Sequence, residues 1–131
     1  MTVSDKIHFD HVGPQFRVKS VAASVEFYKQ VLGFDIDYSQ GSPPNYAVVF
    51  RDNVYIHLCE EGPQKAEIGP GCSFIVISEV EQLWSQIQVY AVDVVEPLGQ
   101  NDYGQGVQVK EFSIRDRDQN ILRIGELINN L

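Results

Sequence analysis

The spacing of apolar residues in the first half of the chain predicts the order β-α-β-β-β. In residues 13 to 20, Phe16 and Val18 alternate with Gln15 and Arg17, which is typical of a strand with one buried face. Apolar residues then recur at helical spacing: Val21, Val25, Tyr28 and Leu32. Ser20 is suited to begin this helix and Gly33 to end it. Strands are expected at 34–38, 46–51 and 54–60, the last two joined by a tight turn at Asp52 and Asn53.

The second half repeats this order. Residues 72 to 77 predict a strand, and Ser78 with Glu81 forms a capping-box pattern before an apolar helical stripe: Val80, Leu83, Trp84 and Ile87. A strand is expected at 91–97 and a long loop at 98–106. Further strands follow at 107–115 and 121–126. A repeat of this length cannot bury its apolar face alone, so the two modules must pack together. We expect an α+β domain over 1–131, with modules at about 10–60 and 71–127 and a linker at 61–70.

The last hairpin of each module carries one polar residue at the same place in its alternating strand. His57 shares a strand face with Tyr55, whereas Ile56 and Leu58 take the opposite face. In the second module Arg123 shares a face with Ile121, opposite Leu122 and Ile124. Because side chains alternate along a strand, burial of the aliphatic pairs directs His57 and Arg123 to the other side of the sheet.

Two stretches resemble the glyoxalase, bleomycin-resistance and extradiol-dioxygenase proteins of the vicinal oxygen chelate superfamily. They are "FRVKSVAASVEFYKQVLGF", at 16–34, and "VQVKEFSIRDRDQNILRIGE", at 107–126. The closing turn of this family usually reads Asp-Pro-Asp-Gly-Asn. Here Arg117 replaces Pro and Gln119 replaces Gly, and Asn120 is a residue that can take the left-handed conformation. The resemblance implies two β-α-β-β-β modules that curl around a cleft, commonly in a homodimer.

Metal-dependent members of this family bind one divalent ion with four side chains from the first and last strands of each module. By register, the resemblance places Gly13, His57, Cys72 and Arg123 at these positions. Gly13 has no side chain, and Arg123 is a cation without an available lone pair. We therefore expect no metal, no cofactor and no catalytic residue here. His8 and His11 precede the first strand. A register slip could move His11 into the first ligand position, but the helix motif counted back from Ser24 puts Gly13 there. Both histidines are therefore expected to be exposed or capping side chains of an N-terminal arm.

Composition narrows the set of partners. Hydrophobic residues make up 44% of the chain and charged residues 21%, an ordinary globular balance. Ten Lys and Arg against 18 Asp and Glu give a net charge of −8, which repels nucleic acid and anionic membranes. Cys59 and Cys72 are too few for a disulfide framework and are expected to be reduced. With no apolar run long enough to span a bilayer and no signal-like start, the expected location is cytosolic.

The predicted function is binding of a small molecule, drug-like or acidic, in a cleft between the modules. Aromatic walls with a few polar groups are usual in such pockets. The candidate ligand-binding residues are Gln15, Arg17, Tyr46, Tyr55, His57, Cys72, Tyr103 and Arg123. Guanidinium groups suit carboxylates, although the net charge favours a cationic ligand at encounter.

Several alternatives remain open. Arg123 could pair with a nearby carboxylate such as Glu111, and His57 could be a core histidine. The chain could also be a metal-dependent lyase, isomerase or dioxygenase of the same superfamily, or a structural dimer with a vestigial cleft.

Overall fold

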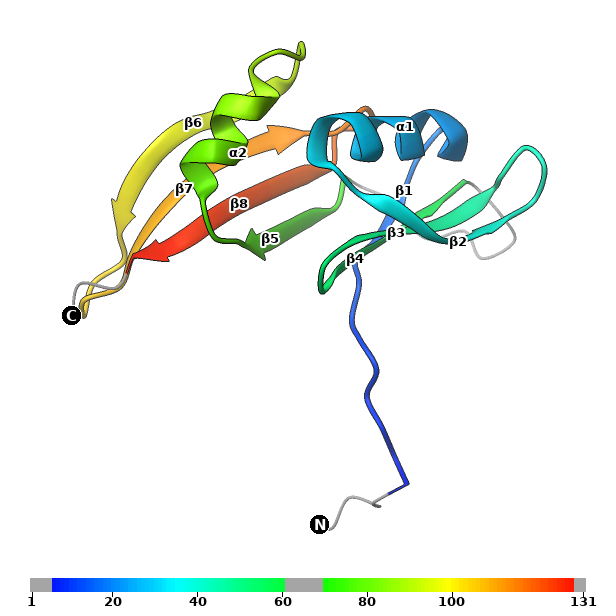
Figure 1. Cartoon of the computed structure of the whole chain (residues 1–131), viewed down its shortest axis with the longest axis horizontal. Helices are drawn as coiled ribbons and strands as arrows, with labels where there is room; N and C mark the ends of the chain where they lie inside the picture. The colour runs from blue at the N-terminus through cyan, green and yellow to red at the C-terminus, as the bar shows by residue number, and fades with distance from the viewer. Residues whose placement is uncertain (1–5, 61–69, 129–131) are drawn as a thin grey trace.

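The computed structural model describes residues 6–60 and 70–128, and it contains the predicted β-α-β-β-β order twice (Figure 1). The elements of the first module are β1 (Gln15–Arg17), α1 (Val21–Leu32), β2 (Asp35–Gln40), β3 (Tyr46–Arg51) and β4 (Val54–Cys59). Those of the second are β5 (Cys72–Val76), α2 (Val80–Ile87), β6 (Asp93–Asp102), β7 (Gln108–Arg115) and β8 (Ile121–Ile128). The α+β fold class is confirmed. Apart from residue 70, the predicted linker lies outside the described residues.

Each module forms a four-stranded sheet with the same topology. The strand orders are β1-β4-β3-β2 and β5-β8-β7-β6. In each sheet the first strand runs parallel to the last, and the other pairs are antiparallel. His57 lies between Gln15 and Val48. Arg123 lies between Phe74 and Ser113. His57 and Arg123 thus occupy equivalent positions in the two sheets.

Helix α1 begins and ends as its sequence predicts. The Ser20 hydroxyl accepts a hydrogen bond from the Ala23 amide, and Gly33 adopts a left-handed conformation with φ of 73°. Helix α2 differs, because its N-cap is Glu79 in a left-handed conformation with no side-chain cap bond. The predicted Ser78–Glu81 capping box is therefore wrong.

Both helices share a cap that the sequence pattern did not reveal. A carboxylate from the end of the neighbouring strand accepts a hydrogen bond from the first helical amide: Glu60 from Val21, and Glu126 from Val80. A negative group at this end also complements the helix dipole. The repeat thus extends to a long-range contact in each module.

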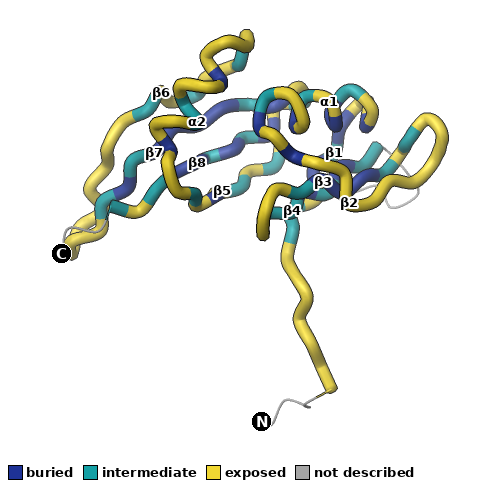
Figure 2. Tube along the Cα trace, viewed as in Figure 1, coloured by how far each residue is buried: buried dark blue, intermediate teal, exposed yellow. Residues whose placement is uncertain are grey.

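One hydrophobic core joins the modules between the helices and the sheets. The two helices cover the same side of the molecule, and the buried positions follow the strands beneath them (Figures 1 and 2). The largest fully buried side chains include Tyr28, Phe16, Phe112, Ile56 and Ile124. Burying a side chain of this size is worth about 1.5–3 kcal/mol. On β4 and β8 the buried residues are the predicted aliphatic ones, Ile56, Leu58, Leu122 and Ile124.

The modules also meet through a close backbone contact. A Cβ atom on Gly71 would lie 2.6 Å from the ring of Phe16, so only glycine fits between them. The Gly71 amide donates to the Asn120 side chain at 2.7 Å. This contact places the start of β5 beside β1.

Two loops differ from the sequence prediction. Strand β6 continues to Asp102, so most of the loop expected at 98–106 is strand, paired with β7. In the closing turn the left-handed residue is Gln119, with φ of 72°, in the place where the family has Gly. Asn120 is instead buried, and its side-chain amide donates a hydrogen bond to Asp116. The described residues form two helices, α1 and α2. Neither helix is long and apolar enough to cross a membrane.

Candidate functional site

His57 is the centre of a polar group on the exposed face of the first sheet. Its Nδ1 atom lies 2.7 Å from the Tyr46 hydroxyl, which is brought near by the β3–β4 pairing. The Gln15 side chain from β1 donates to the same hydroxyl at 3.5 Å, a long contact. Three predicted residues from three strands therefore meet at one point.

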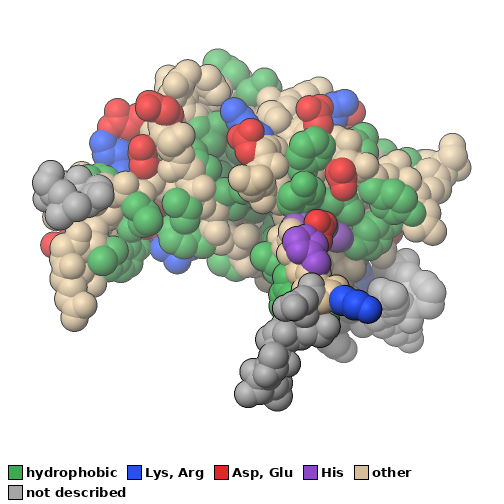
Figure 3. All heavy atoms as spheres, turned by 60° about the horizontal axis from the view of Figure 1, so that its bottom comes forward, with side chains coloured by type: hydrophobic (Ala, Val, Ile, Leu, Met, Phe, Trp, Pro, Cys, Tyr) green, Lys and Arg blue, Asp and Glu red, His purple; other side chains and the backbone are tan. Residues whose placement is uncertain are grey.

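Aromatic rings extend this group along the sheet face. Tyr55 stacks on His11 with ring centroids 4.3 Å apart, and His11 lies 5.9 Å from His57. On its other side Tyr55 stacks on Phe50 at 5.8 Å. Figure 3 shows the histidine side chains gathered beside hydrophobic ones on this face. We call Phe50, Tyr55, His11, His57 and Tyr46 the aromatic row.

His57 is the member of the aromatic row whose pKa is shifted, in the direction that favours the neutral ring. Burial lowers the pKa of His57 from its ordinary value of 6.5, and His11 lowers it further, whereas Asp37 acts in the opposite direction. A neutral imidazole flanked by rings presents a flat surface. One of its ring nitrogens donates a hydrogen bond and the other accepts one. Such a surface suits stacking with a planar ligand.

Arg123 is the centre of a charged group on the equivalent face of the second sheet. Its Nη2 atom donates to Glu111 at 2.7 Å and to the Tyr103 hydroxyl at 3.1 Å. The Tyr103 hydroxyl donates to the second oxygen of Glu111 at 2.5 Å, and the guanidinium lies 4.7 Å from the ring centre of Phe74. We call Tyr103, Glu111 and Arg123 the charged triplet. The alternative in which Arg123 pairs with Glu111 is thus confirmed.

Hydrogen bonding fixes the ionisation of the charged triplet. Burial raises the pKa of Glu111, but hydrogen bonds from Tyr103, Arg123 and Asn101 outweigh it and hold the pKa below its ordinary value. The bond to Glu111 raises the pKa of Tyr103 and also that of Arg123. Glu111 is therefore a carboxylate and Tyr103 a neutral donor at pH 7.

A cavity of about 650 Å³ lies against the charged triplet. Among the described residues of its wall, those that carry a charge at neutral pH are Glu96, Asp102, Glu111 and Arg123, so three carboxylates face one cation. Pro97, Leu98 and Phe112 add apolar surface. The size is within the usual range for a small-molecule pocket.

The four positions that the family resemblance assigns to a metal do not fit one. A Cβ atom on Gly13 would lie 2.9 Å from both the His57 ring and the Tyr55 carbonyl oxygen, so no ligating side chain has room there. Arg123 is a cation held by Glu111, and Cys72 is exposed at the start of β5 opposite Ile121. Within residues 6–60 and 70–128, no three His, Cys, Asp or Glu side chains are grouped to hold an ion.

The predicted site residues divide into two separate groups. Gln15, Tyr46, Tyr55 and His57 meet on the first sheet, and Tyr103 and Arg123 meet on the second. No hydrogen bond or ring contact between described residues joins these groups. Arg17 lies opposite Cys59 at the end of β1, and Cys72 takes part in neither group.

His11 is a member of the site, which the sequence predicted only for a slipped register. It was expected to be a side chain of the N-terminal arm, but it packs on Tyr55. The sequence gives no periodic signal for this contact, because His11 lies before β1 and outside the alternation of that strand.

Residues 8–124 match the model of the Glyoxalase/Bleomycin resistance protein/Dioxygenase superfamily. The chain belongs to this superfamily. No curated protein matches the sequence.

Solved structures share the fold at low identity. TioX from Micromonospora sp. ML1 is 14% identical with a TM-score of 0.78, over 92% of this chain and 100% of TioX. A virulence protein from Salmonella typhimurium is 20% identical with a TM-score of 0.71, over 93% and 100% of the two chains. A lactoylglutathione lyase from Agrobacterium tumefaciens is 15% identical with a TM-score of 0.66, over 88% and 92%. At these levels of sequence identity, the likeness between this chain and the three solved structures shows a common fold alone.

Proposed function

We propose that this superfamily member binds a small organic ligand on the exposed faces of its sheets and holds it without chemistry. The observation that carries the proposal is the pair of equivalent polar positions in the two modules. At these positions His57 is bonded to Tyr46 and Arg123 to Glu111, where metal-dependent relatives would place ion ligands. A metal-dependent lyase, isomerase or dioxygenase would also need a ligand at Gly13, where a side chain has no room.

The walls favour a planar, drug-like ligand over an acidic one. The aromatic row offers a stacking surface, and the cavity by the charged triplet has more carboxylates than cations. A ligand carboxylate would have to displace Glu111 from Arg123, and Glu111 is only 9% exposed. The acidic ligand expected from the sequence therefore has less support than an aromatic ligand that is neutral or cationic. A cytosolic location stays a prediction.

A homodimer is part of the same proposal. The two groups of site residues lie on different sheets, and a second copy would allow the aromatic row of one chain to face the charged triplet of the other. The segment before β1 runs away from the body of the molecule (Figure 1) and exposes three large apolar residues: Ile7 at 58%, Phe9 at 88% and Val12 at 89%. Contact with a second chain would bury them. Light scattering that gives a monomer mass at micromolar concentration would contradict the dimer.

A thermal-shift screen tests the proposed binding. The probes are aromatic antibiotics, including glycopeptides, with small carboxylates and divalent metals as the contrasting classes. A ligand at a hundredfold excess over its Kd should add about 2.7 kcal/mol to the free energy of unfolding. We expect a shift from an aromatic compound, with no turnover of it.

Matched variants connect the shift to the aromatic row. Tyr55→Leu removes a stacking ring, and we expect it to weaken binding by about 0.5–1.5 kcal/mol. Tyr90→Leu, at a position 41% exposed and outside the row, is the control and should leave binding unchanged. A shift produced only by a divalent metal, and lost in His57→Ala, would overturn the proposal in favour of the metal-dependent enzyme.

A further inference from the structure

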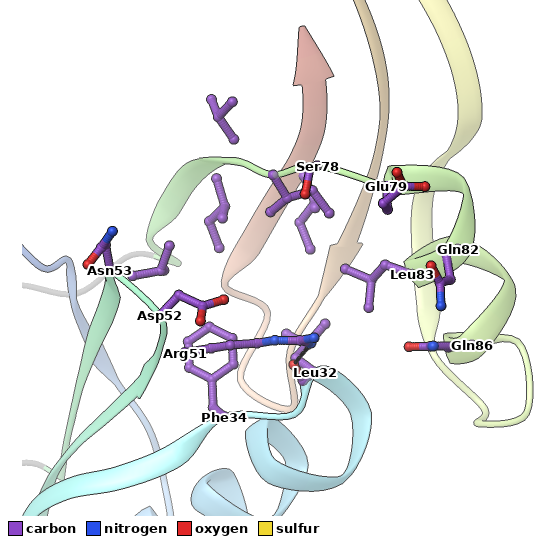
Figure 4. A pocket seen from close by; sticks show the side chains of 15 residues that line it. Leu32, Phe34, Arg51, Asp52, Asn53, Ser78, Glu79, Gln82, Leu83 and Gln86 are labelled. Carbon is purple, nitrogen blue, oxygen red and sulfur yellow. Dashed lines mark hydrogen bonds between the residues drawn. The ribbon is translucent and has the colours of Figure 1, made fainter.

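A second cavity, of about 490 Å³, lies between the modules on the helix side of the sheets. Strand β8 separates it from the candidate site, because Ile124 lines this cavity whereas the preceding Arg123 lines the other. We call it the junction pocket. Its inner wall is apolar: Leu32, Phe34, Ile75, Ile77, Leu83 and Ile124. Figure 4 shows the β3–β4 turn on one side of the pocket and α2 on the other.

The equivalent junction on the other side of the molecule is filled. There the β7–β8 turn lies against α1, and the Tyr28 hydroxyl donates to Asp116 at 2.8 Å in a fully buried contact. Tyr28 and Ile87 are both the eighth residue of their helices. Ile87 has no hydroxyl to reach the opposite turn, and the turn at Asp52 and Asn53 is shorter than the one from Asp116 to Asn120. Ile87 itself is buried and does not line the junction pocket, which lies between the shorter turn and α2.

Two carboxylates at the rim of the junction pocket have no partner among the residues that the structure describes. Neither the Asp52 nor the Glu79 side chain forms a hydrogen bond or an ion pair with the residues that the structure describes. Both residues are exposed, and both hold left-handed backbone conformations, with φ of 52° and 58°. Such conformations are uncommon for residues other than Gly, Asn and Asp.

The one cation of the pocket wall is already engaged. Arg51 donates to the carbonyl oxygen of Leu32 at 2.8 Å, at the negative end of α1. It also packs over Gly33, where a Cβ atom would lie 3.0 Å from its Nη1. The remaining rim groups are uncharged: Asn53, Ser78, Gln82 and Gln86. The pocket therefore combines an apolar wall with a negative, hydrogen-bonding rim.

We propose that the junction pocket is a binding site for a small primary amine with a short apolar tail. The ammonium group would lie at the negative rim, where Asp52 and Glu79 stand on opposite sides of the pocket, and the tail would lie against the apolar wall. The net charge of −8 favours encounter with a cation. This site is independent of the function proposed for the exposed faces of the sheets.

Three probes with the same six-carbon tail test the charge requirement. Hexylammonium, hexanol and hexanoate are titrated separately into the ¹⁵N-labelled full chain, and amide chemical shifts are followed. We expect hexylammonium to bind most tightly and hexanoate least, with shifts at the β3–β4 turn and the start of α2. Equal affinities, shifts located at the aromatic row or the charged triplet instead, or no saturable shift up to the solubility limit of hexylammonium would overturn the proposal.

Conservative variants test the two carboxylates. Asp52→Asn keeps a residue that tolerates the left-handed conformation and removes only the charge. A partly exposed ion pair is worth little, so we expect each of Asp52→Asn and Glu79→Gln to weaken hexylammonium binding about threefold, and the double variant about tenfold. Glu26→Gln, on the exposed side of α1, removes the same charge elsewhere and should change the affinity little. An equal loss of affinity in Glu26→Gln would show that only the net charge of the chain matters, and would overturn the proposed site.

A tail-length series tests the apolar wall. Butylammonium carries the same charge as hexylammonium with two methylene groups fewer. Affinity should rise by up to about fourfold for each methylene buried. No gain from butyl to hexyl would show that the tail stays in water, and would overturn the apolar part of the site.

Discussion

The hairpins that close the two modules share one backbone frame and carry different chemistry. In β3–β4 the register brings Tyr46 to His57, a neutral pair beside stacked rings. In β7–β8 the same register brings Glu111 to Arg123, a charged pair. The difference teaches that a duplicated fold fixes where a side chain points, whereas residue identity alone decides whether the surface stacks or forms ion pairs.

The turns of the two hairpins differ in the same way. Asp116 is 4% exposed and accepts hydrogen bonds from the Tyr28 hydroxyl, the Asp118 amide and the Asn120 amide and side chain. Asp52 begins the equivalent turn but is exposed and has no such donors among the described residues. One junction of the modules is thus held by a buried polar network, and the other leaves a pocket.

The largest effect is expected from removing the buried turn carboxylate. Asp116→Ala leaves the Tyr28 hydroxyl and the Asn120 donors buried without their acceptor, and should lower the free energy of unfolding by roughly 3–4 kcal/mol. Asp52→Asn is the matched control in the open turn and should change it by less than about 0.5 kcal/mol. Urea melts of both variants measure this, and similar losses would mean that the two junctions do not differ energetically.

A moderate effect is expected at the charged pair. Arg123→Ala leaves the Glu111 carboxylate, 9% exposed, without its cation. Breaking a fully buried ion pair costs about 3–5 kcal/mol, but the Arg123 side chain is 40% exposed, so screening by water reduces the expected loss to about 1–2 kcal/mol. Arg123→Lys should recover part of it, because an ammonium lacks the planar fork.

The control for the charged pair lies on the same hairpin. Arg115 contacts Asp93 at 3.4 Å, and both side chains are substantially exposed. Arg115→Ala should therefore cost less than about 0.5 kcal/mol. A loss in Arg115→Ala as large as that in Arg123→Ala would remove the distinction between a paired site residue and an ordinary surface arginine.

The smallest effect is a different response of the two faces to acid. The folded pKa of His57 lies below its ordinary value of 6.5, so the unfolded chain takes up the proton first and stability declines as the pH falls below about 6.5. The folded pKa of Glu111 also lies below its ordinary value of 4.5. Its contribution is therefore present above pH 4.5 and is lost only as the pH falls further.

Titration by NMR separates these two steps. We expect the His57 resonances to shift with a midpoint below 6.5, and the midpoint to rise in His11→Gln, because the second ring no longer opposes protonation. In Glu111→Gln the loss of stability that is expected below pH 4.5 should disappear, whereas the titration of His57 should remain. A His57 midpoint above 6.5 would contradict the burial that the structure shows for this ring.

Local patterns in the sequence predicted the repeated frame and the direction of the key side chains. Ser20 and Gly33 at the ends of α1 and the aliphatic pairs of β4 and β8 are as expected. These features depend on period and capping, which are properties of neighbouring residues. The prediction was wrong where a long-range contact replaced a local signal. Glu126 caps α2 in place of Ser78, and pairing with β7 extends β6 into the expected loop.

The sequence by itself determined two β-α-β-β-β modules and placed His57 and Arg123 on the strand faces opposite the buried aliphatic residues. Only the tertiary structure decided how these residues are used. It placed His11 on Tyr55, paired Arg123 with Glu111 and Tyr103, and left a pocket between the β3–β4 turn and α2. The physical reason is that alternation along a strand is set by adjacent residues, whereas each of these contacts joins segments separated in the chain, and such contacts exist only after the sheets have formed and packed.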